Sequence, residues 1–433
     1  MVKKFLLVLL LITIMEVSLL AQVKETKLPN GIDFVYKNIP GVKVTSVQVW
    51  MKTGSVNEDS KINGISHFLE HLVFKGTSKF KPDEIDSIVE ANGGQMNAAT
   101  SKDYTFYYIT IPTYNSKVAF EVLSEMVFNA TFIEEEIDKE RPVVIQEIKR
   151  KYDNPTYDMW KYVSDTLYKD LPYSMEIIGT EDNIKNFTRK QIVDYYNKYY
   201  HPQNMTLVVV GDISYDEAKK FAETYFNKTK SVSAGKAYST DTQIKLSDDQ
   251  FKIFKKELSQ TYAAIVYPSF SILDKRNSSL DVLTEILSSG ENSILTSILK
   301  NRLNLVTSIY AGSMGQKYVG SFVIYFTSED KDFKKVIAET DKIIADILEG
   351  KIEEDMITRA KNRLKSQVIF QREKTSSEAN DIGYSFTLGI RDYYFKYTEM
   401  IDKVTKEDIV SVAKDIFNNH RLIVATSKSD LSL

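Results

Sequence analysis

The sequence of 433 residues contains no cysteine. Disulfide bonds and thiolate metal sites are therefore excluded, and any metal ion must be bound by histidine, aspartate or glutamate side chains. Histidine is also scarce, with four residues in the whole chain. No long basic run is present and the formal net charge is −3 at pH 7, so we expect no nucleic acid as a partner.

One long apolar run is present at the N-terminus, where Lys3 and Lys4 precede the apolar residues 5–15. A charged start followed by a short apolar block is typical of a secretory signal peptide, and the block is short for a membrane span. We therefore predict a signal peptide over residues 1–21 and an exported, periplasmic or otherwise extracytoplasmic protein. The alternative is an uncleaved segment that tethers the chain to a membrane, since Leu19 poorly suits a cleavage site.

Similar patterns recur in the two halves of the chain. Residues 188–200 and 405–417 each indicate a threonine-capped amphipathic helix, followed by a short polar break and a β-branched strand. Upstream, residues 134–147 resemble residues 353–366. These pairs predict a duplicated α+β unit of roughly two hundred residues, a normal domain size. The alternative is a chance likeness of helix–strand patterns.

The order of predicted elements defines the fold class. Strands occur in runs that do not alternate strictly with helices, which favours an α+β fold. We expect two homologous units, each a mostly antiparallel or mixed sheet with helices packed on one face. The N-terminal half is placed at residues 22–226, a polar linker at 227–246, and the C-terminal half at 247–433.

Two of the four histidines lie one helical turn apart in the stretch His67-Phe68-Leu69-Glu70-His71. On a helix, His67, Glu70 and His71 fall within an arc of roughly 100°. Two imidazoles at i and i+4 can bind one Zn²⁺, and Glu70 beside them suits a general base acting on water. The alternative is a solvated helix face, but the apolar neighbours Phe68 and Leu69 argue against it.

The HFLEH motif resembles the inverted zinc motif of the pitrilysin-like (M16, inverzincin) metallopeptidases. The resemblance extends to residues 93–108, 140–148 and 199–212. The chain length and two-half plan are similar to the subfamily that includes mitochondrial processing peptidase. The resemblance implies a zinc-dependent endopeptidase that hydrolyses peptides or unfolded segments, with one Zn²⁺ per chain and a C-terminal half without metal ligands.

The same resemblance implies further roles for acidic residues. The third zinc ligand of the family corresponds to Glu147, which stands 76 residues after His71. Glu140, seven residues before Glu147, corresponds to a carboxylate that supports the site by orienting His71 or a water. We therefore predict Glu70 and Glu140 as the catalytic carboxylates. The alternative for Glu140 is a solvated residue in an acidic run.

A strand of small side chains is the candidate substrate site. Asn97, Ala98, Ala99 and Thr100 follow the turn signal Gly93–Gly94. Small side chains let another backbone approach, and in the family this edge strand pairs with the substrate peptide by main-chain hydrogen bonds. The alternative is an ordinary edge strand.

The resemblance fails at one point in the second half. Single-chain members of the family carry an Arg and a Tyr that hold the substrate carbonyl. The matching positions here are Lys300 and Thr307, while Arg302 and Tyr310 are near but out of register. We therefore predict a related M16-like partner subunit that supplies the Arg/Tyr pair. The alternative is a non-catalytic peptide-binding or assembly subunit of an M16-like complex.

Overall fold

A computed structural model describes residues 23–228, 238–239 and 243–433. The predicted signal peptide, residues 1–21, lies outside these residues, as does much of the predicted linker at 227–246. Among the described helices, none combines the length and the apolar character that crossing a bilayer requires.

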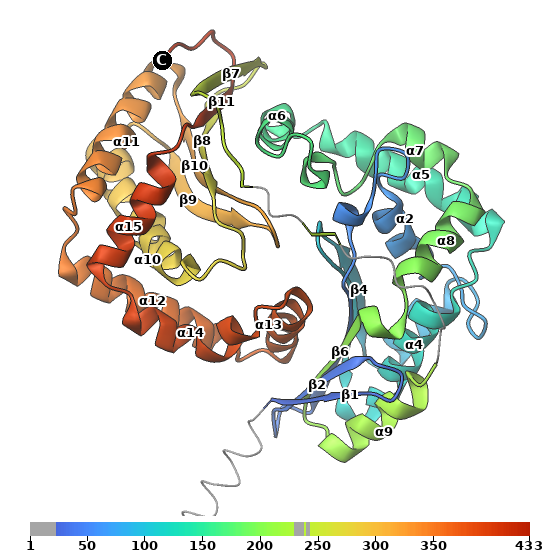
Figure 1. Cartoon of the computed structure of the whole chain (residues 1–433). Coiled ribbons are helices and arrows are strands. Elements are labelled where there is room, and N and C mark those ends of the chain that lie inside the picture. Colours follow the sequence, from blue (N-terminus) through green and yellow to red (C-terminus); the bar gives the residue numbers. More distant parts are fainter. Residues whose placement is uncertain (1–22, 229–237, 240–242) are drawn as a thin grey trace, which may run out of the picture. The chain divides into compact units, whose positions relative to one another are not determined.

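The described residues form two compact units, each with its own sheet and helices (Figure 1). Unit 1 consists of the described parts of Met1–Gln146, Glu176–Tyr238 and Gln371–Arg391. Unit 2 consists of the described parts of Glu147–Met175, Ser239–Phe370 and Asp392–Leu433. The units are not identical to the two halves of the sequence, because each contains a segment from the other half.

The sheet of unit 1 has the strand order β1-β2-β6-β3-β5-β4. Its strands are β1 (Lys24–Lys27), β2 (Asp33–Asn38), β3 (Val44–Met51), β4 (Gln95–Thr100), β5 (Thr105–Pro112) and β6 (Met205–Gly211). The β2–β6 pair is parallel and the others are antiparallel. The central strands β3 and β6 are almost entirely buried, as their β-branched sequences favour.

Helices cover both faces of the sheet in unit 1. They are α2 (Ile65–Leu72), α3 (Glu84–Ala91), α4 (Ser116–Asn129), α5 (Glu134–Lys151), α7 (Glu181–Asn186), α8 (Arg189–Tyr199), α9 (Tyr215–Tyr225) and α13 (Thr375–Leu388). Figure 1 shows α13 on the side of the sheet opposite to α4, and α13 packs against β3 and β6. The sequence analysis predicted helices on one face only, and in unit 1 the helix α13 from the C-terminal half also covers the other face.

The buried polar residues of β3 explain why α13 packs there. Gln48 is fully buried and donates to Asn380 of α13 at 2.8 Å, while it accepts from Trp50 Nε1 at 2.8 Å. A buried amide without partners is costly, so α13 completes this side of the sheet. The ion pair between Lys37 and the buried Glu378 also joins the sheet to α13.

The sheet of unit 2 has the strand order β7-β11-β8-β10-β9. Its strands are β7 (Gln250–Lys255), β8 (Thr261–Ser269), β9 (Ser308–Gly315), β10 (Gly320–Ser328) and β11 (Leu422–Ser427). The parallel β7–β11 pair matches β2–β6, and the remaining antiparallel strands repeat the order of unit 1. Two mixed sheets of the same topology confirm the predicted α+β fold class.

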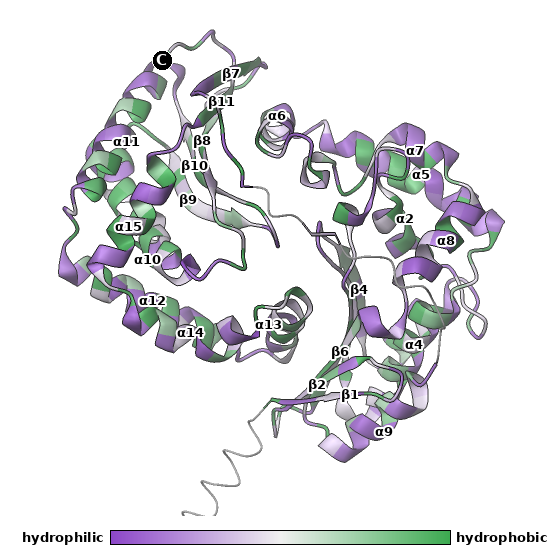
Figure 2. Cartoon of the chain, in the orientation of Figure 1, coloured by the Kyte–Doolittle hydropathy of each residue, from purple (hydrophilic) through white to green (hydrophobic). Residues whose placement is uncertain are grey.

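The core of unit 2 lies between its sheet and amphipathic helices. These are α6 (Tyr157–Leu167), α10 (Asn277–Ser288), α11 (Phe333–Leu348), α12 (Glu354–Gln371), α14 (Arg391–Lys403) and α15 (Lys406–Phe417). In α11 the buried residues recur at helical spacing, and Figure 2 shows hydrophobic and hydrophilic bands along this helix. Helix α6, from the N-terminal half, packs against β7 and β11.

Equivalent helices of the two halves begin with the same cap. The Thr188 hydroxyl accepts a hydrogen bond from the Gln191 backbone N–H at the start of α8, and the Gln191 side chain accepts one from the Thr188 backbone N–H. Thr405 and Asp408 form the same reciprocal pair at the start of α15. The two capping boxes account for the helix starts that the sequence indicates.

Candidate metal centre

Helix α2 carries the histidine pair and is anchored at its N-terminus by the carboxylate of Glu58, which lies in the loop before the helix. Glu58 is buried and accepts from the backbone N–H groups of Gly64 and Ser66, both at 2.8 Å, and from the Asn63 amide at 3.0 Å. These bonds satisfy donors that the first helical turn leaves without partners. Burial raises the pKa of Glu58, and its hydrogen bonds offset part of this effect.

Glycine is required at the start of α2. Gly64 has a φ of +99°, and a Cβ there would meet the Cα of Gly179 at 2.8 Å. Another residue would therefore be strained by both its backbone conformation and this contact. The close approach of the two backbones holds the N-terminus of the histidine helix against the segment before α7.

The structure brings His67, His71 and Glu147 together. Their candidate ligand atoms all lie within 4.8 Å of one another, and the two imidazole centroids are 4.8 Å apart. Glu147 is one residue beyond the boundary between the units, but it lies inside the continuous helix α5 and its place follows from that helix. Within the described part of the chain, no other group of this kind is found.

The protonation of the group suits a zinc ion. Burial, together with the charge of His71, lowers the pKa of His67 to about 4, so its imidazole is neutral at pH 7 and can bind a metal. His71 Nδ1 is 2.9 Å from Glu140, and an Nδ1–H that donates there leaves Nε2 as the metal-binding nitrogen. Two imidazoles and one carboxylate are a common donor set for catalytic zinc.

Glu140 is held from two sides. It is 6% exposed, and its carboxylate accepts from His71 and pairs with the Lys75 ammonium at 3.0 Å. Burial opposes ionisation, but the bonds from His71 and Lys75 outweigh it and lower the pKa of Glu140. Glu140 is therefore an ionised carboxylate that can fix the ring orientation and tautomer of His71.

Glu70 lies between α2 and the sheet. Its Oε2 accepts a hydrogen bond of 2.6 Å from the Thr100 hydroxyl on β4. The buried Tyr107 and Tyr200 form a hydroxyl pair of 2.7 Å. Burial, together with the charge of Glu70, raises the pKa of both tyrosines. This environment directs the Glu70 carboxylate from the helix toward β4.

The predicted substrate strand is an edge of the sheet. β4 pairs with β5 on one side, and its other edge has no strand partner among residues 23–228, 238–239 and 243–433. Asn97 and Ala99 are exposed, whereas Ala98 and Thr100 on the opposite face are half-buried. An open edge with small side chains is suited to main-chain pairing with a peptide.

Comparison with known proteins identifies the family. Residues 33–181 match the family model described as insulinase (peptidase family M16), and residues 186–364 match the one described as peptidase M16 inactive domain. The chain belongs to the M16 peptidase family. This result confirms the family that the HFLEH motif predicts.

Several M16 relatives match almost the whole chain. An "Uncharacterized zinc protease" of Rickettsia felis is 28% identical over 94% of this chain and 98% of that protein. The mitochondrial-processing peptidase subunit beta of Saccharomyces cerevisiae is 28% identical over 92% of this chain and 88% of that protein. A protease from Helicobacter pylori has a crystal structure with a TM-score of 0.86 and 26% identity, covering 94% of this chain and 100% of that chain. These names support a peptidase at the level of the family.

The residues near the M16 Arg/Tyr positions all lie in unit 2. Lys300 and Arg302 belong to a π-helix, Thr296–Arg302. Thr307 is short and its hydroxyl lies 2.5 Å from that of Thr327 on β10. Tyr310 lies on the edge strand β9 and is 55% exposed. Neither Lys300 nor Thr307 reproduces the fork of an arginine or the phenol of a tyrosine.

Two residues that support the M16 site were not predicted from the sequence. Lys75 lies one turn beyond His71, and this i, i+4 spacing from a metal ligand is a signal that could have identified it. Glu58 carries no comparable signal, because its role depends on a loop that returns to the start of α2.

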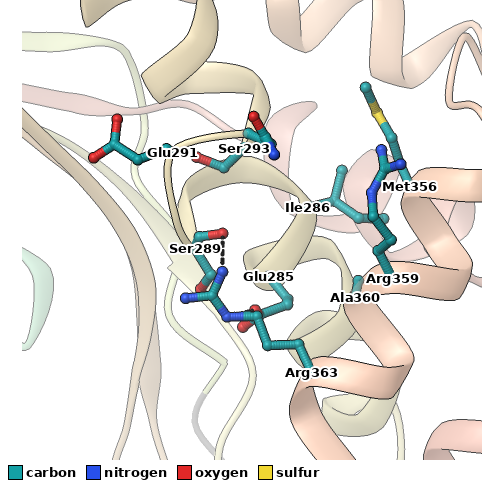
Figure 3. Close-up of a pocket in the computed structure, with 10 residues that line it drawn as sticks. Glu285, Ile286, Ser289, Glu291, Ser293, Met356, Arg359, Ala360 and Arg363 are labelled. Carbon is teal, nitrogen blue, oxygen red and sulfur yellow. Dashed lines mark hydrogen bonds and ion pairs between the residues drawn. The ribbon is translucent and has the colours of Figure 1, made fainter.

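A pocket in unit 2 was also considered as a site. Figure 3 shows Glu285, Ser289 and Arg363 in its wall. Arg363 pairs with Glu285 at 2.8 Å and donates to the Ser289 carbonyl at 2.7 Å, so its charge is already matched. The pocket lining contains no histidine, so the candidate metal ligands are those on α2 and α5.

Proposed function

We propose that this chain is a zinc-dependent endopeptidase that hydrolyses peptides or unfolded segments. The observation that carries the proposal is the convergence of His67, His71 and Glu147, with Glu70 on the same helix and 76 residues separating His71 from Glu147. A structural role alone would not require two imidazoles and a carboxylate at one point. The zinc proteases among the M16 relatives support the same reaction class.

Each candidate site residue has a defined role in this reaction. Bound zinc supplies Lewis acidity, which polarises a carbonyl and lowers the pKa of water. Glu70 takes the proton from the attacking water and passes it to the departing amine. Glu140 keeps His71 in the metal-binding tautomer. The edge of β4, which includes Asn97, Ala98, Ala99 and Thr100, binds the peptide backbone.

Zinc content and peptide hydrolysis test the proposal together. The purified chain should contain about one zinc per molecule. Together with a related M16 chain it should cleave a quenched fluorescent peptide library, and a chelator should abolish cleavage. Glu70→Gln should retain zinc while kcat/KM falls by about 10²- to 10⁴-fold, because the general base is lost. Unchanged hydrolysis by Glu70→Gln would refute this role for Glu70.

The proposed enzyme works with a second subunit. Lys300 and Thr307 occupy the positions where single-chain members of the M16 family carry Arg and Tyr. A related partner subunit would therefore supply that pair. The relatives named as beta subunits of a processing peptidase support this arrangement. We expect low activity from the chain alone and a large gain with a related M16 chain. Full activity of the lone monomer would exclude the pairing.

A non-catalytic peptide-binding or assembly subunit is the second candidate. The absent Arg/Tyr pair and the match of residues 186–364 to a model described as an inactive domain favour it. Under this alternative, Glu70→Gln would leave every measurable property unchanged, while peptides would still bind. Peptide hydrolysis by the wild type and its loss in Glu70→Gln would indicate the endopeptidase, whereas peptide binding without hydrolysis would indicate the second function.

We also propose that the protein acts outside the cytoplasm. The charged start and apolar block of residues 1–21 support export through a signal peptide. Cell fractionation with N-terminal sequencing of the mature chain tests this proposal. A start after Ala21 indicates cleavage, whereas an intact N-terminus in the membrane fraction indicates a tether. Recovery of the intact chain in the cytoplasm would refute export.

A further inference from the structure

We propose that Thr100 is a positioning residue for Glu70: its hydroxyl orients the carboxylate that acts as general base. The inference rests on the proposed function and concerns a step within it. The carrying observation is the 2.6 Å hydrogen bond from Thr100 Oγ1 to Glu70 Oε2, which joins the edge strand β4 to the histidine helix α2.

The register of β4 determines where the hydroxyl lies. Exposure alternates along Gln95–Thr100, so Met96, Ala98 and Thr100 share the half-buried face of the strand. Helix α2 packs against this strand. Thr100 is the last residue of β4 and lies opposite Thr105 of β5. The alternation therefore presents the hydroxyl to α2, while Asn97 and Ala99 lie on the exposed face.

Orientation of the carboxylate matters because a general base must present an oxygen to water in one direction. A glutamate side chain has several rotatable bonds, and fixing it costs conformational entropy during catalysis unless a partner holds it beforehand. A hydrogen bond to one carboxylate oxygen provides this restraint, and charge-assisted bonds of this type are stronger than neutral ones. Thr100 thus lowers the cost of presenting Glu70 in its reactive direction.

The same bond connects substrate binding to the base. The backbone of Thr100 belongs to the strand that is proposed to pair with the peptide, and its side chain holds Glu70. Because pairing uses main-chain groups, removal of the hydroxyl should leave peptide affinity almost unchanged. The effect should therefore be found in kcat and not in KM, which separates positioning from substrate contact.

Two substitutions isolate the hydroxyl. Thr100→Val keeps the β-branched shape that the strand favours and removes the donor, whereas Thr100→Ser keeps the donor and removes the methyl group. Thr110→Val is the matched control, because Thr110 lies on β5 opposite Gln95 and donates to Ser46 at 3.2 Å. All variants are compared with the wild type and Glu70→Gln, as the full chain with the same partner.

We expect Thr100→Val to lower kcat by about 10- to 100-fold, with KM within about threefold of wild type. Zinc content and thermal midpoint should stay as in the wild type. Thr100→Ser and Thr110→Val should have nearly wild-type kcat. In crystal structures of the zinc-loaded variants, the Glu70 carboxylate should be displaced by Thr100→Val and retained by Thr100→Ser.

Failure of the positioning role can be distinguished from failure of the proposed endopeptidase function. If the wild type cleaves peptides, Glu70→Gln is inactive and Thr100→Val has wild-type kcat, the positioning role is wrong while the endopeptidase stands. Equal losses in Thr100→Val and Thr100→Ser also overturn it, because the methyl packing would then be responsible. If Glu70→Gln is as active as the wild type, the proposed function is wrong. Independently of activity, a Glu70 carboxylate that keeps its wild-type position in the crystal structure of Thr100→Val overturns the positioning role.

Discussion

Replacement of Glu140 by glutamine tests how the metal group is organised. Glu140 holds His71 at 2.9 Å and Lys75 at 3.0 Å, one partner on each carboxylate oxygen. A glutamine has nearly the same shape but one acceptor oxygen, so it can serve one of the two donors. Its NH₂ group then faces the other donor.

The expected loss of zinc affinity in Glu140→Gln follows from the burial and the charge of Glu140. Glu140 is 6% exposed, so water cannot easily replace the lost acceptor. A hydrogen bond to a charged group contributes about 1.5–3 kcal/mol. Loss of a carboxylate that supports a metal-binding histidine commonly weakens metal affinity by about 10- to 100-fold, or about 1.4–2.8 kcal/mol, and the two ranges agree. We therefore expect Glu140→Gln to weaken zinc binding by about 10- to 100-fold.

Competition with a chromophoric chelator measures the zinc Kd of each variant. Glu135→Gln is the matched control on the same helix, because Glu135 is 75% exposed and pairs with Lys139 at the surface. Lys75→Met removes one partner of Glu140 and leaves the bond to His71, so its effect should be smaller, below about tenfold. A zinc Kd for Glu140→Gln within about threefold of wild type would refute the reasoning.

Three further predictions concern stability. Glu58→Ala leaves buried donors at the start of α2 without their acceptor and should lower the free energy of unfolding by about 3–5 kcal/mol in urea; a loss below about 1 kcal/mol would contradict this role. Asp281 is half-buried beneath Tyr393 and Tyr397, and desolvation raises its pKa from 3.8 to about 6 despite the hydrogen bonds from both tyrosines. A raised folded-state pKa gives stability that is complete below 3.8 and is lost as pH rises to about 6, by about 3 kcal/mol. The free energy of unfolding of Asp281→Asn, measured in urea relative to that of the wild type, should therefore increase by about 3 kcal/mol between pH 4 and pH 7. A difference that stays constant with pH would show that Asp281 does not titrate in this way. Gly290 and Gly389 both have a φ of +86°. A Cβ at Gly290 would meet the end of the Arg363 side chain at 2.2 Å and would displace it from Glu285 and the Ser289 carbonyl, whereas one at Gly389 would meet nothing within 4 Å. Gly290→Ala should therefore lower the thermal midpoint more than Gly389→Ala, and equal shifts would exclude the clash with Arg363.

Much of the fold follows from local patterns. The β-branched strands predicted after residues 188–200 and 405–417 are observed at Met205–Gly211 and Leu422–Ser427. The capped helices that begin after Thr188 and Thr405 also lie where the sequence places them. These features depend on neighbouring residues, so a window of the chain contains the information. The exchange of α6 and α13 between the halves is not a local property, and the sequence analysis did not predict it.

The residues of the candidate site also differ in how far the sequence alone identifies them. The common face of His67, Glu70 and His71 is a consequence of helical periodicity, and the sequence by itself determines it. The identity of Glu147 as their companion came from the family resemblance, since many glutamates are present at similar distances along the chain.

Tertiary structure decided the contacts that join distant segments. It brought Thr100 to Glu70, and it brought His71 and Lys75 to Glu140. The physical reason is that such contacts form where a whole core packs and buried polar groups must find partners. Helical spacing depends on the backbone of one segment, whereas the partner of a buried side chain depends on every segment that closes around it.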